Sequence, residues 1–258
     1  MGEGTATLSI SGAVATLTID HGARRNALSV PVRTALKAGL VAAQSDPAVR
    51  AIVLTGAGGH FSAGGDISTM AETTPWSLRQ RLTIVQDCIR LIVKGPQPVI
   101  AAVEGNAAGG GLALAAACDL VVAAEGAQFA ASFPKIGLMP DMGLAYTLPR
   151  RIGGGAARRI MLTAASFGAG EALRLGLADE VVANGATLER AQALAAGIAT
   201  LAPTAIASTK RVLAAPVTDL DTALEMEAQA QGLLFATDDF REGIAAFLAK
   251  RKPEFKNG

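Results

Sequence analysis

The feature that most constrains the fold is a repeated unit in the first half of the chain: an apolar strand, a glycine-rich loop and a helix. The segments 51–55 (AIVLT) and 99–103 (VIAAV) are apolar throughout, which is typical of strands covered on both faces. Glycine-rich loops follow at 56–66 and 105–111, and each leads into a segment with the character of a helix. This alternation predicts an α/β layered core.

Other elements extend the pattern. Alternating residues predict strands at 5–10 and 14–19, and an apolar run predicts another at 120–123. Ser29 and Pro31 indicate a helix that begins near residue 29, because Ser caps helices and Pro is tolerated in the first turn. Helices are expected at 29–44, 75–93, 112–117, 187–199, 204–213, 220–235 and 239–250.

The strand signals fade after Pro134, and the last third of the chain has a helical pattern. No low-complexity linker separates this part from the rest. We therefore predict a core, residues 1–200, followed by a helical C-terminal region, residues 201–258, that packs on the core or on another subunit.

Composition and charge exclude several classes of protein. The chain carries 23 Lys and Arg against 22 Asp and Glu, so it lacks the basic surface of nucleic-acid-binding proteins. No apolar stretch approaches the roughly 20 residues of a membrane span, and no signal peptide precedes the first strand. Cys88 and Cys118 form no CxxC pair, so neither a disulfide framework nor a metal site is expected. These features predict a cytoplasmic protein without nucleic-acid or membrane partners.

The residues alone leave two interpretations of the glycine-rich loops. A dinucleotide or P-loop site is disfavoured, because no loop completes G-x-G-x-x-G and no G-x-x-x-x-G-K-[ST] occurs. The loops after 51–55 and 99–103 could each present a backbone N–H, and two such donors on one oxygen form an oxyanion hole. Alternatively, these glycines serve only turns and close packing.

Four segments, in order along the chain, resemble the enoyl-CoA hydratase/isomerase (crotonase) superfamily. They are 59–67 (GHFSAGGDI), 102–112 (AVEGNAAGGGL), 136–143 (IGLMPDMG) and 240–255. The resemblance implies a spiral of strand–strand–helix turns with a helical trimerisation region at the C-terminus, assembled as a homotrimer or a dimer of trimers. It implies an acyl-CoA thioester as substrate. It implies no metal and no cofactor other than the coenzyme A of the substrate.

The resemblance also implies the residues of the site. The backbone N–H groups of Ala63 and Gly110 match the oxyanion hole that holds the thioester oxygen and stabilises an enolate. Hydratases of the superfamily carry two glutamates, whose positions are here Ala113 and Lys135, so we expect no true hydratase. The positions implied in substrate binding are Arg25, Ala27, Gly65, Asp66, Ile67 and Gly109.

Asp141 follows Leu138-Met139-Pro140 and resembles the acid/base residue of enoyl-CoA isomerases in this superfamily. A single carboxylate can take a proton from C2 of a 3-enoyl-CoA and return it at C4. Apolar surroundings would raise its pKa towards a useful base strength. Asp is also a favoured helix N-cap, and a short helix is expected at 142–148. The two roles need not exclude each other.

Other functions stay open. The same oxyanion hole could support thioester hydrolysis, decarboxylation or dehalogenation, with Asp141 as nucleophile or base. A non-catalytic acyl-CoA-binding subunit is favoured by the loss of both glutamates and opposed by the presence of Asp141. The region 69–82, with Met70, Trp76 and Leu78, is expected to shape the acyl pocket, and Glu104 to form an ion pair.

Overall fold

The computed structural model describes residues 4–69 and 74–256, which contain a large and a small β-sheet. In the large sheet β1 and β2 form an antiparallel hairpin, and each later pair of neighbouring strands is parallel. Its strands, in spatial order, are β1 (Thr5–Ser11), β2 (Val14–Asp20), β3 (Ala51–Gly56), β4 (Val99–Val103), β6 (Leu120–Ala124) and β9 (Glu180–Val182).

The small sheet begins where the chain leaves the carboxyl end of β4. Its strands, in spatial order, are β5 (Asn106–Ala108), β7 (Gln128–Ala130) and β8 (Ser166–Gly168). Pairing is parallel between β5 and β7 and antiparallel between β7 and β8. In sheets of this kind ligands bind beyond the carboxyl ends of the parallel strands. A ligand site is therefore expected in the loops between the two sheets.

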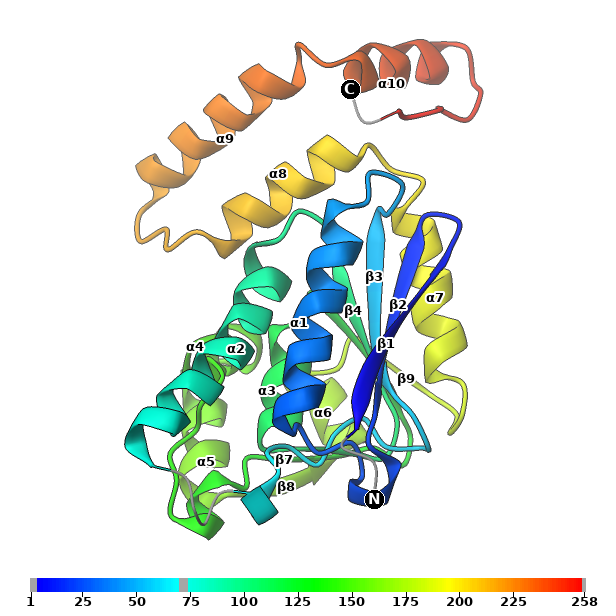
Figure 1. The fold of residues 1–258 in the computed structure, drawn as a ribbon. Coiled ribbons are helices and arrows are strands. Elements are labelled where there is room, and N and C mark those ends of the chain that lie inside the picture. The colour runs from blue at the N-terminus through cyan, green and yellow to red at the C-terminus, as the bar shows by residue number, and fades with distance from the viewer. Residues whose placement is uncertain (1–3, 70–73, 257–258) are drawn as a thin grey trace.

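Helices cover both faces of the large sheet (Figure 1). On one face lies α1 (Val30–Ser45), with α2 (Pro75–Lys94) and α3 (Gly110–Ala117) beside it, and on the other lies α7 (Thr187–Ile198). Successive side chains of a strand point to opposite faces. Leu54 therefore joins the core under α1, whereas its neighbour Val53 packs with Ala191 of α7. Cover on both faces explains why β3 and β4 are apolar at every position.

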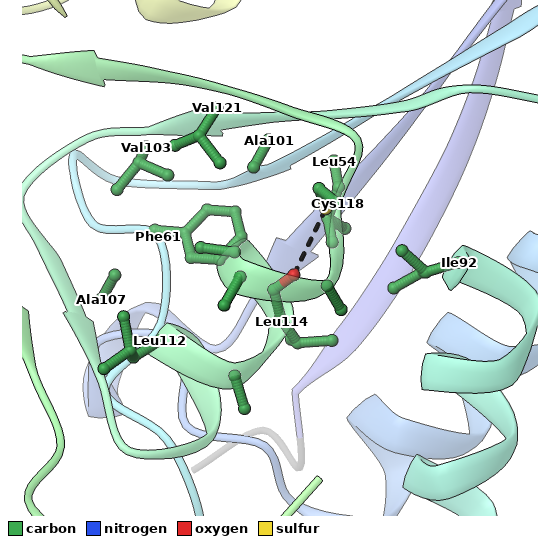
Figure 2. Packing of buried hydrophobic residues seen from close by; sticks show 14 of the residues in the cluster. Leu54, Phe61, Ile92, Ala101, Val103, Ala107, Leu112, Leu114, Cys118 and Val121 are labelled. Carbon is green, nitrogen blue, oxygen red and sulfur yellow. Dashed lines mark hydrogen bonds between the residues drawn. The ribbon is translucent and has the colours of Figure 1, made fainter. Parts of the chain in front are cut away.

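Phe61 anchors the loop that follows β3. Its ring is fully buried and lies among the side chains of Val103, Ala107 and Leu112, between the sheet and α3 (Figure 2). Burial of a large aromatic side chain is strongly favourable, so Phe61 fixes the first residues of the loop in place. The backbone from Ser62 onwards is consequently held beside the first turn of α3.

The second half of the chain is mostly helical. Its helices are α4 (Leu144–Ile152), α5 (Gly154–Thr163), α6 (Ala169–Leu175), α7, α8 (Pro203–Ala214), α9 (Leu220–Leu234) and α10 (Asp238–Leu248). Figure 1 shows α8, α9 and α10 at the end of the molecule opposite the small sheet. No single helix within the described residues is long and apolar enough to cross a membrane. Among the same residues, α7 and α8 taken together, bent by 110°, have the length and composition.

The α/β class is confirmed, and β3 and β4 lie within one residue of the predicted strands. The prediction that strands fade after Pro134 is wrong, because β8 and β9 occur there; strands of three residues are too short to show an alternating pattern. The sequence also missed α5 and α6, and α3 begins at Gly110 rather than residue 112. The division into residues 1–200 and 201–258 stays a prediction.

Candidate active site

The two glycine-rich loops are hydrogen-bonded to each other. Ser62, after β3, forms an isolated parallel bridge with Ala107 of β5. The Ser62 N–H donates to the carbonyl oxygen of Asn106 at 2.9 Å, and the Ala108 N–H donates to that of Ser62 at 3.0 Å. The structure therefore brings together the loops that carry Ala63 and Gly110.

Glycine is required where these loops touch. Gly64 has a φ of +92°, and a Cβ on it would lie 2.6 Å from the carbonyl oxygen of Ala108. A Cβ on Gly111 would lie 2.2 Å from the carbonyl oxygen of Ser62. Gly109 precedes α3 with a φ of +52° and is buried. The close packing offered above as the alternative to a donor role is thus real, and it aligns the backbones of the two loops.

The two predicted oxyanion donors differ in their surroundings. Gly110 is the first residue of α3, so its N–H has no partner within the helix and lies at the positive end of the helix dipole. The Ala63 N–H donates to the carbonyl oxygen of Arg25 at 2.9 Å. A substrate oxygen would have to share the Ala63 N–H with Arg25 or replace it.

The turn around Asn26 is hydrogen-bonded to the loop that carries Ala63. Asn26 is fully buried in a left-handed conformation (φ +59°), and its Nδ2 donates to the carbonyl oxygen of His60 at 2.6 Å. In return, the Oγ of Ser62 donates to the carbonyl oxygen of Asn26 at 2.7 Å. Ala27, predicted to bind substrate, is buried in the same turn, where its N–H donates to the carbonyl oxygen of Arg24 at 3.1 Å and its carbonyl oxygen accepts from the Ser29 N–H at 2.9 Å.

Asp66 ties the end of the loop to the same turn. Its carboxylate accepts hydrogen bonds from Arg24 at 2.7 and 2.8 Å and from the Oγ of Ser68 at 2.7 Å. Burial raises the pKa of Asp66, but the hydrogen bonds from Ser68 and Arg24 outweigh that effect and hold the pKa below its usual value. Asp66 therefore organises the loop, whereas its contact with substrate stays a prediction.

The other residues predicted to bind substrate are exposed or partly exposed. Arg25 is exposed, Ile67 is 60% exposed, and Gly65 forms an isolated parallel bridge with Leu28. Trp76 and Leu78, expected to shape the acyl pocket, are exposed near the start of α2. Met70, named for the same pocket, lies outside the described residues.

Asp141 is not a helix cap. The helix predicted at 142–148 begins at Leu144, because Met142 and Gly143 both have left-handed backbones with φ of +52° and +73°. The N-cap is Gly143, and no side chain caps the helix. Asp141 is half-buried, and burial raises the pKa of its carboxyl group, while the positive charge of Arg33 acts in the opposite direction. A carboxylate with a raised pKa is suited to general acid/base work.

Met142 links this carboxylate to the glycine-rich loops. Its side chain is buried, and a Cβ on Gly110 would lie 2.8 Å from its Sδ. The residue that follows Asp141 therefore packs directly on the backbone of a predicted oxyanion donor. The structure thus places the neighbour of the predicted base against one of the two predicted oxyanion donors, which is far from it in the sequence.

The two positions that carry glutamate in hydratases offer no carboxylate here. Ala113 is fully buried in α3, and Lys135 is exposed in the 3₁₀ helix Phe133–Ile136. Glu104, expected to form an ion pair, instead accepts hydrogen bonds from the Gly185 N–H at 2.9 Å and from the Oγ of Thr187 at 2.8 Å. Glu104 therefore secures the start of α7.

No role was predicted from the sequence for Met142 or Arg33. Arg33 is only 8% exposed and stands on the apolar stripe of α1 with Leu36 and Leu40, at spacings i, i+3 and i+7. A charged residue at an apolar position of a helix is unusual, and this is the sequence signal that marks Arg33 as a residue with a specific role. No group of three or more His, Cys, Asp or Glu side chains that could hold a metal lies among the residues the structure describes.

Comparison with known proteins gives the chain a family context. The model of the enoyl-CoA hydratase/isomerase family matches residues 9–258. A crotonyl-CoA hydratase from Syntrophomonas wolfei is 37% identical over 244 residues, 94% of each chain. The 1,2-epoxyphenylacetyl-CoA isomerase of Escherichia coli is 35% identical over 248 residues, also 94% of each chain. The crystal structure of an enoyl-CoA hydratase from Polaromonas sp. JS666 matches with a TM-score of 0.94 and 34% identity, covering 98% of this chain and 100% of that one.

Proposed function

Since the chain belongs to the enoyl-CoA hydratase/isomerase family, we propose that it moves the double bond of an enoyl-CoA thioester, with Asp141 as acid and base. The predicted crotonase-type fold is confirmed by the match to the Polaromonas structure, and processing of acyl-CoA thioesters follows from the family. Isomerisation, rather than another reaction of this family, is the part that we propose.

The observation that carries the proposal is a half-buried Asp141 with a raised pKa at a site where Ala113 and Lys135 replace the two hydratase glutamates. Hydration requires one group to deprotonate water and another to protonate carbon. Isomerisation requires a single group that removes a proton and returns it at another carbon. Because Asp141 is the one carboxylate among residues 113, 135 and 141, this site favours isomerisation over hydration.

In the proposed reaction the Asp141 carboxylate removes a proton from C2 of a 3-enoyl-CoA. The electrons of the C–H bond move to the thioester oxygen and give a dienolate. The N–H groups of Gly110 and Ala63 stabilise that oxygen, the latter in competition with the Arg25 carbonyl group. Protonated Asp141 then delivers its proton to C4, and the double bond comes to lie between C2 and C3. No water is consumed, and the carboxylate is regenerated.

A paired assay tests this proposal. One arm supplies a 3-enoyl-CoA and follows the appearance of the conjugated 2-enoyl thioester; the other supplies a 2-enoyl-CoA and follows hydration. We expect isomerisation without hydration, and we expect the Asp141→Asn variant to lose it. Product masses detect thioester hydrolysis in the same arms; decarboxylation and dehalogenation are tested with a carboxylated and a halogenated acyl-CoA, whose products differ from the substrate in mass.

Hydration is the second candidate, because the Syntrophomonas relative is named a crotonyl-CoA hydratase. Hydration by the wild type would overturn the proposal and would mean that a group other than residues 113 and 135 positions water. Binding of acyl-CoA with silence in both arms would instead favour a non-catalytic acyl-CoA-binding subunit.

We also propose that the chain assembles in the cytoplasm as a homotrimer or a dimer of trimers. Large apolar side chains on the C-terminal helices support this, among them Leu213, Leu233 and Phe247, the last of which is 83% exposed. A monomer seldom leaves so many such side chains in water, whereas subunit contacts bury them. Light scattering coupled to size exclusion measures the mass, and a monomer would contradict the proposal.

A further inference from the structure

The turn that begins at Asp141 holds a residue that its backbone conformation does not favour. The Leu144 N–H donates to the carbonyl oxygen of Asp141 at 3.0 Å, so residues 141–144 form a four-residue turn. Its two central residues, Met142 and Gly143, have φ of +52° and +73°. Positive φ at both central positions is typical of a type I′ turn, which favours Gly, Asn and Asp. Gly143 suits this turn, whereas the Cβ of Met142 makes its left-handed backbone unfavourable.

Burial of the Met142 side chain offsets this cost. The side chain is 4% exposed and belongs to the same core cluster as Leu28 and Leu112. A residue keeps an unfavourable backbone conformation only where its surroundings determine its position, and such residues gather at functional sites. The contacts of the Met142 side chain therefore fix the turn, and with it the backbone of Asp141.

These contacts meet the glycine-rich loops at one point, beside the α-carbon of Gly110. A Cβ on Gly110 would lie 2.8 Å from the Sδ of Met142, 3.1 Å from the Cδ1 of Leu28 and 3.6 Å from the Cα of Gly64. The glycine thus leaves the space that the thioether occupies. Three segments converge on the first residue of α3 in this way: the turn after Asp141, the turn around Asn26 and the loop after β3.

The other central residue of the turn faces a different element. A Cβ on Gly143 would lie 3.4 Å from the Cγ2 of Ile89, on α2. Gly143 therefore allows the turn to approach α2, whereas Met142 ties the turn to a predicted oxyanion donor. The two residues have separate tasks in the same turn.

We propose that Met142 is a positioning residue of the active site, whose thioether holds Asp141 at a fixed place relative to the N–H of Gly110. The inference rests on the proposed function of Asp141 as acid and base. In that reaction the carboxylate reaches C2 and then C4 while the thioester oxygen stays on the Gly110 N–H. A misplacement of about 1 Å in such an arrangement can cost about 100-fold in rate. A thioether has no proton to exchange, so Met142 acts only through the place of Asp141.

The first test compares Met142→Ala with Met142→Leu. Alanine removes the contact with Gly110, so kcat for isomerisation should fall by about 10- to 100-fold. KM should change little, because the loops predicted to bind the acyl-CoA keep their sequence. Leucine keeps an apolar side chain of similar volume and should restore most of the rate. If Met142→Ala does not fold, Met142→Asn takes its place, since Asn tolerates a left-handed backbone.

The matched control is Met161→Ala. Met161 is a partly buried methionine of α5 that packs against the same core cluster, and it has no contact with Gly110 among those described above. Its replacement removes the same thioether from the same core, so a purely structural effect should appear in both variants. We expect Met161→Ala to keep the wild-type kcat.

A second readout separates positioning from a general loss of structure. With a 3-enoyl-CoA deuterated at C2, the fraction of label that reaches C4 does not depend on how much of the enzyme is folded. A displaced Asp141 delivers its deuteron to C4 more slowly, so more of the label exchanges with water first. We expect a smaller transferred fraction in Met142→Ala and an unchanged one in Met161→Ala. Wild-type kcat and wild-type label transfer in folded Met142→Ala would overturn the inference.

The third test does not depend on turnover. Carbon-13 NMR of carboxyl-labelled aspartate reports on Asp141, whose signal is assigned by its absence from Asp141→Asn. Gly110→Ala places a methyl group against the thioether, so it should displace Met142 and shift the Asp141 signal. In the Met142→Ala background the same substitution should leave that signal in place, because effects transmitted through a shared contact do not add.

The outcomes distinguish the two proposals. An equal shift of the Asp141 signal with and without the Met142 side chain would overturn the inference, even if the chain isomerises enoyl-CoA. A shift that requires the Met142 side chain, in a chain that isomerises no enoyl-CoA, would instead overturn the proposed function alone.

Discussion

The two sides of the candidate site are held by different forces. On the first side, backbones meet directly, and one added Cβ at Gly64 or Gly111 would collide with a carbonyl oxygen. On the second side, Met142, the residue after Asp141, packs on Gly110, and the pKa of the Asp141 carboxyl group is raised by burial and lowered by the positive charge of Arg33. Repulsion between atoms acts over tenths of an ångström, whereas charges act over several ångströms and change with pH. Substitutions on the first side should therefore lower activity by displacing the backbone of the loops. Substitutions that change the charges of the second side should lower it by changing the protonation of residue 141.

The largest effect is expected on the second side. Asp141→Asn removes the proposed base but keeps nearly the same shape, so isomerase activity should fall by about 10²- to 10⁴-fold. Binding of an acyl-CoA, measured by calorimetry, should persist, because the glycine-rich loops are unchanged. Wild-type turnover by the folded variant would remove Asp141 from the mechanism.

On the first side, Gly64→Ala should reduce both stability and activity. Gly64 has a φ of +92° and approaches Ala108 closely, so we expect a loss of about 2–4 kcal/mol in the free energy of unfolding. A displaced Ala63 N–H should lower kcat by about 10²- to 10³-fold. Denaturant titrations and initial rates provide the two values.

The matched control for that variant is Gly58→Ala. Gly58 also has a left-handed φ, +66°, but a Cβ there would meet nothing within 4 Å. It should lose only about 1 kcal/mol through backbone strain and keep its activity. Equal losses of activity in the two variants would mean that close contact is not what aligns the loops.

A smaller effect is expected at Asp66, which joins the first side to the turn before it. Asp66→Asn weakens hydrogen bonds to a charged group and should lower the free energy of unfolding by about 1.5–3 kcal/mol at pH 7. Because the pKa of Asp66 is lowered in the folded state, this contribution is complete above the unfolded pKa of about 3.9 and is lost as the pH falls through the folded value. The difference between wild type and variant should therefore shrink below about pH 4.

Asp87→Asn serves as the control for Asp66→Asn. Asp87 pairs with Lys37 and Arg90 on the outside of α1 and α2, where water screens the charges. Its replacement should cost less than about 1 kcal/mol. A loss as large as that of Asp66→Asn would show that the burial of Asp66 adds nothing to the strength of its ion pair with Arg24.

The sequence predicted the first side better than the second for a physical reason. A buried strand followed by glycines is a local sequence pattern. The positions of Gly64 and Gly110 in the loops after β3 and β4 could therefore be predicted from the residues that surround them. The contact between Met142 and Gly110 joins the segment before α4 to the start of α3, and no spacing in the sequence encodes it. The hydrogen bond from Ala63 to Arg25 was equally hidden, since it depends on the left-handed backbone of Arg25 (φ +48°).

The most direct test of the central claim, a double-bond shift by one carboxylate, uses a 3-enoyl-CoA deuterated at C2. If Asp141 alone carries the proton, part of the deuterium lost from C2 should appear at C4 of the 2-enoyl product, as measured by NMR and mass spectrometry. The same transfer should be absent in Asp141→Asn. A product with a hydroxyl group at C3, or label transfer that persists in Asp141→Asn, would contradict the account.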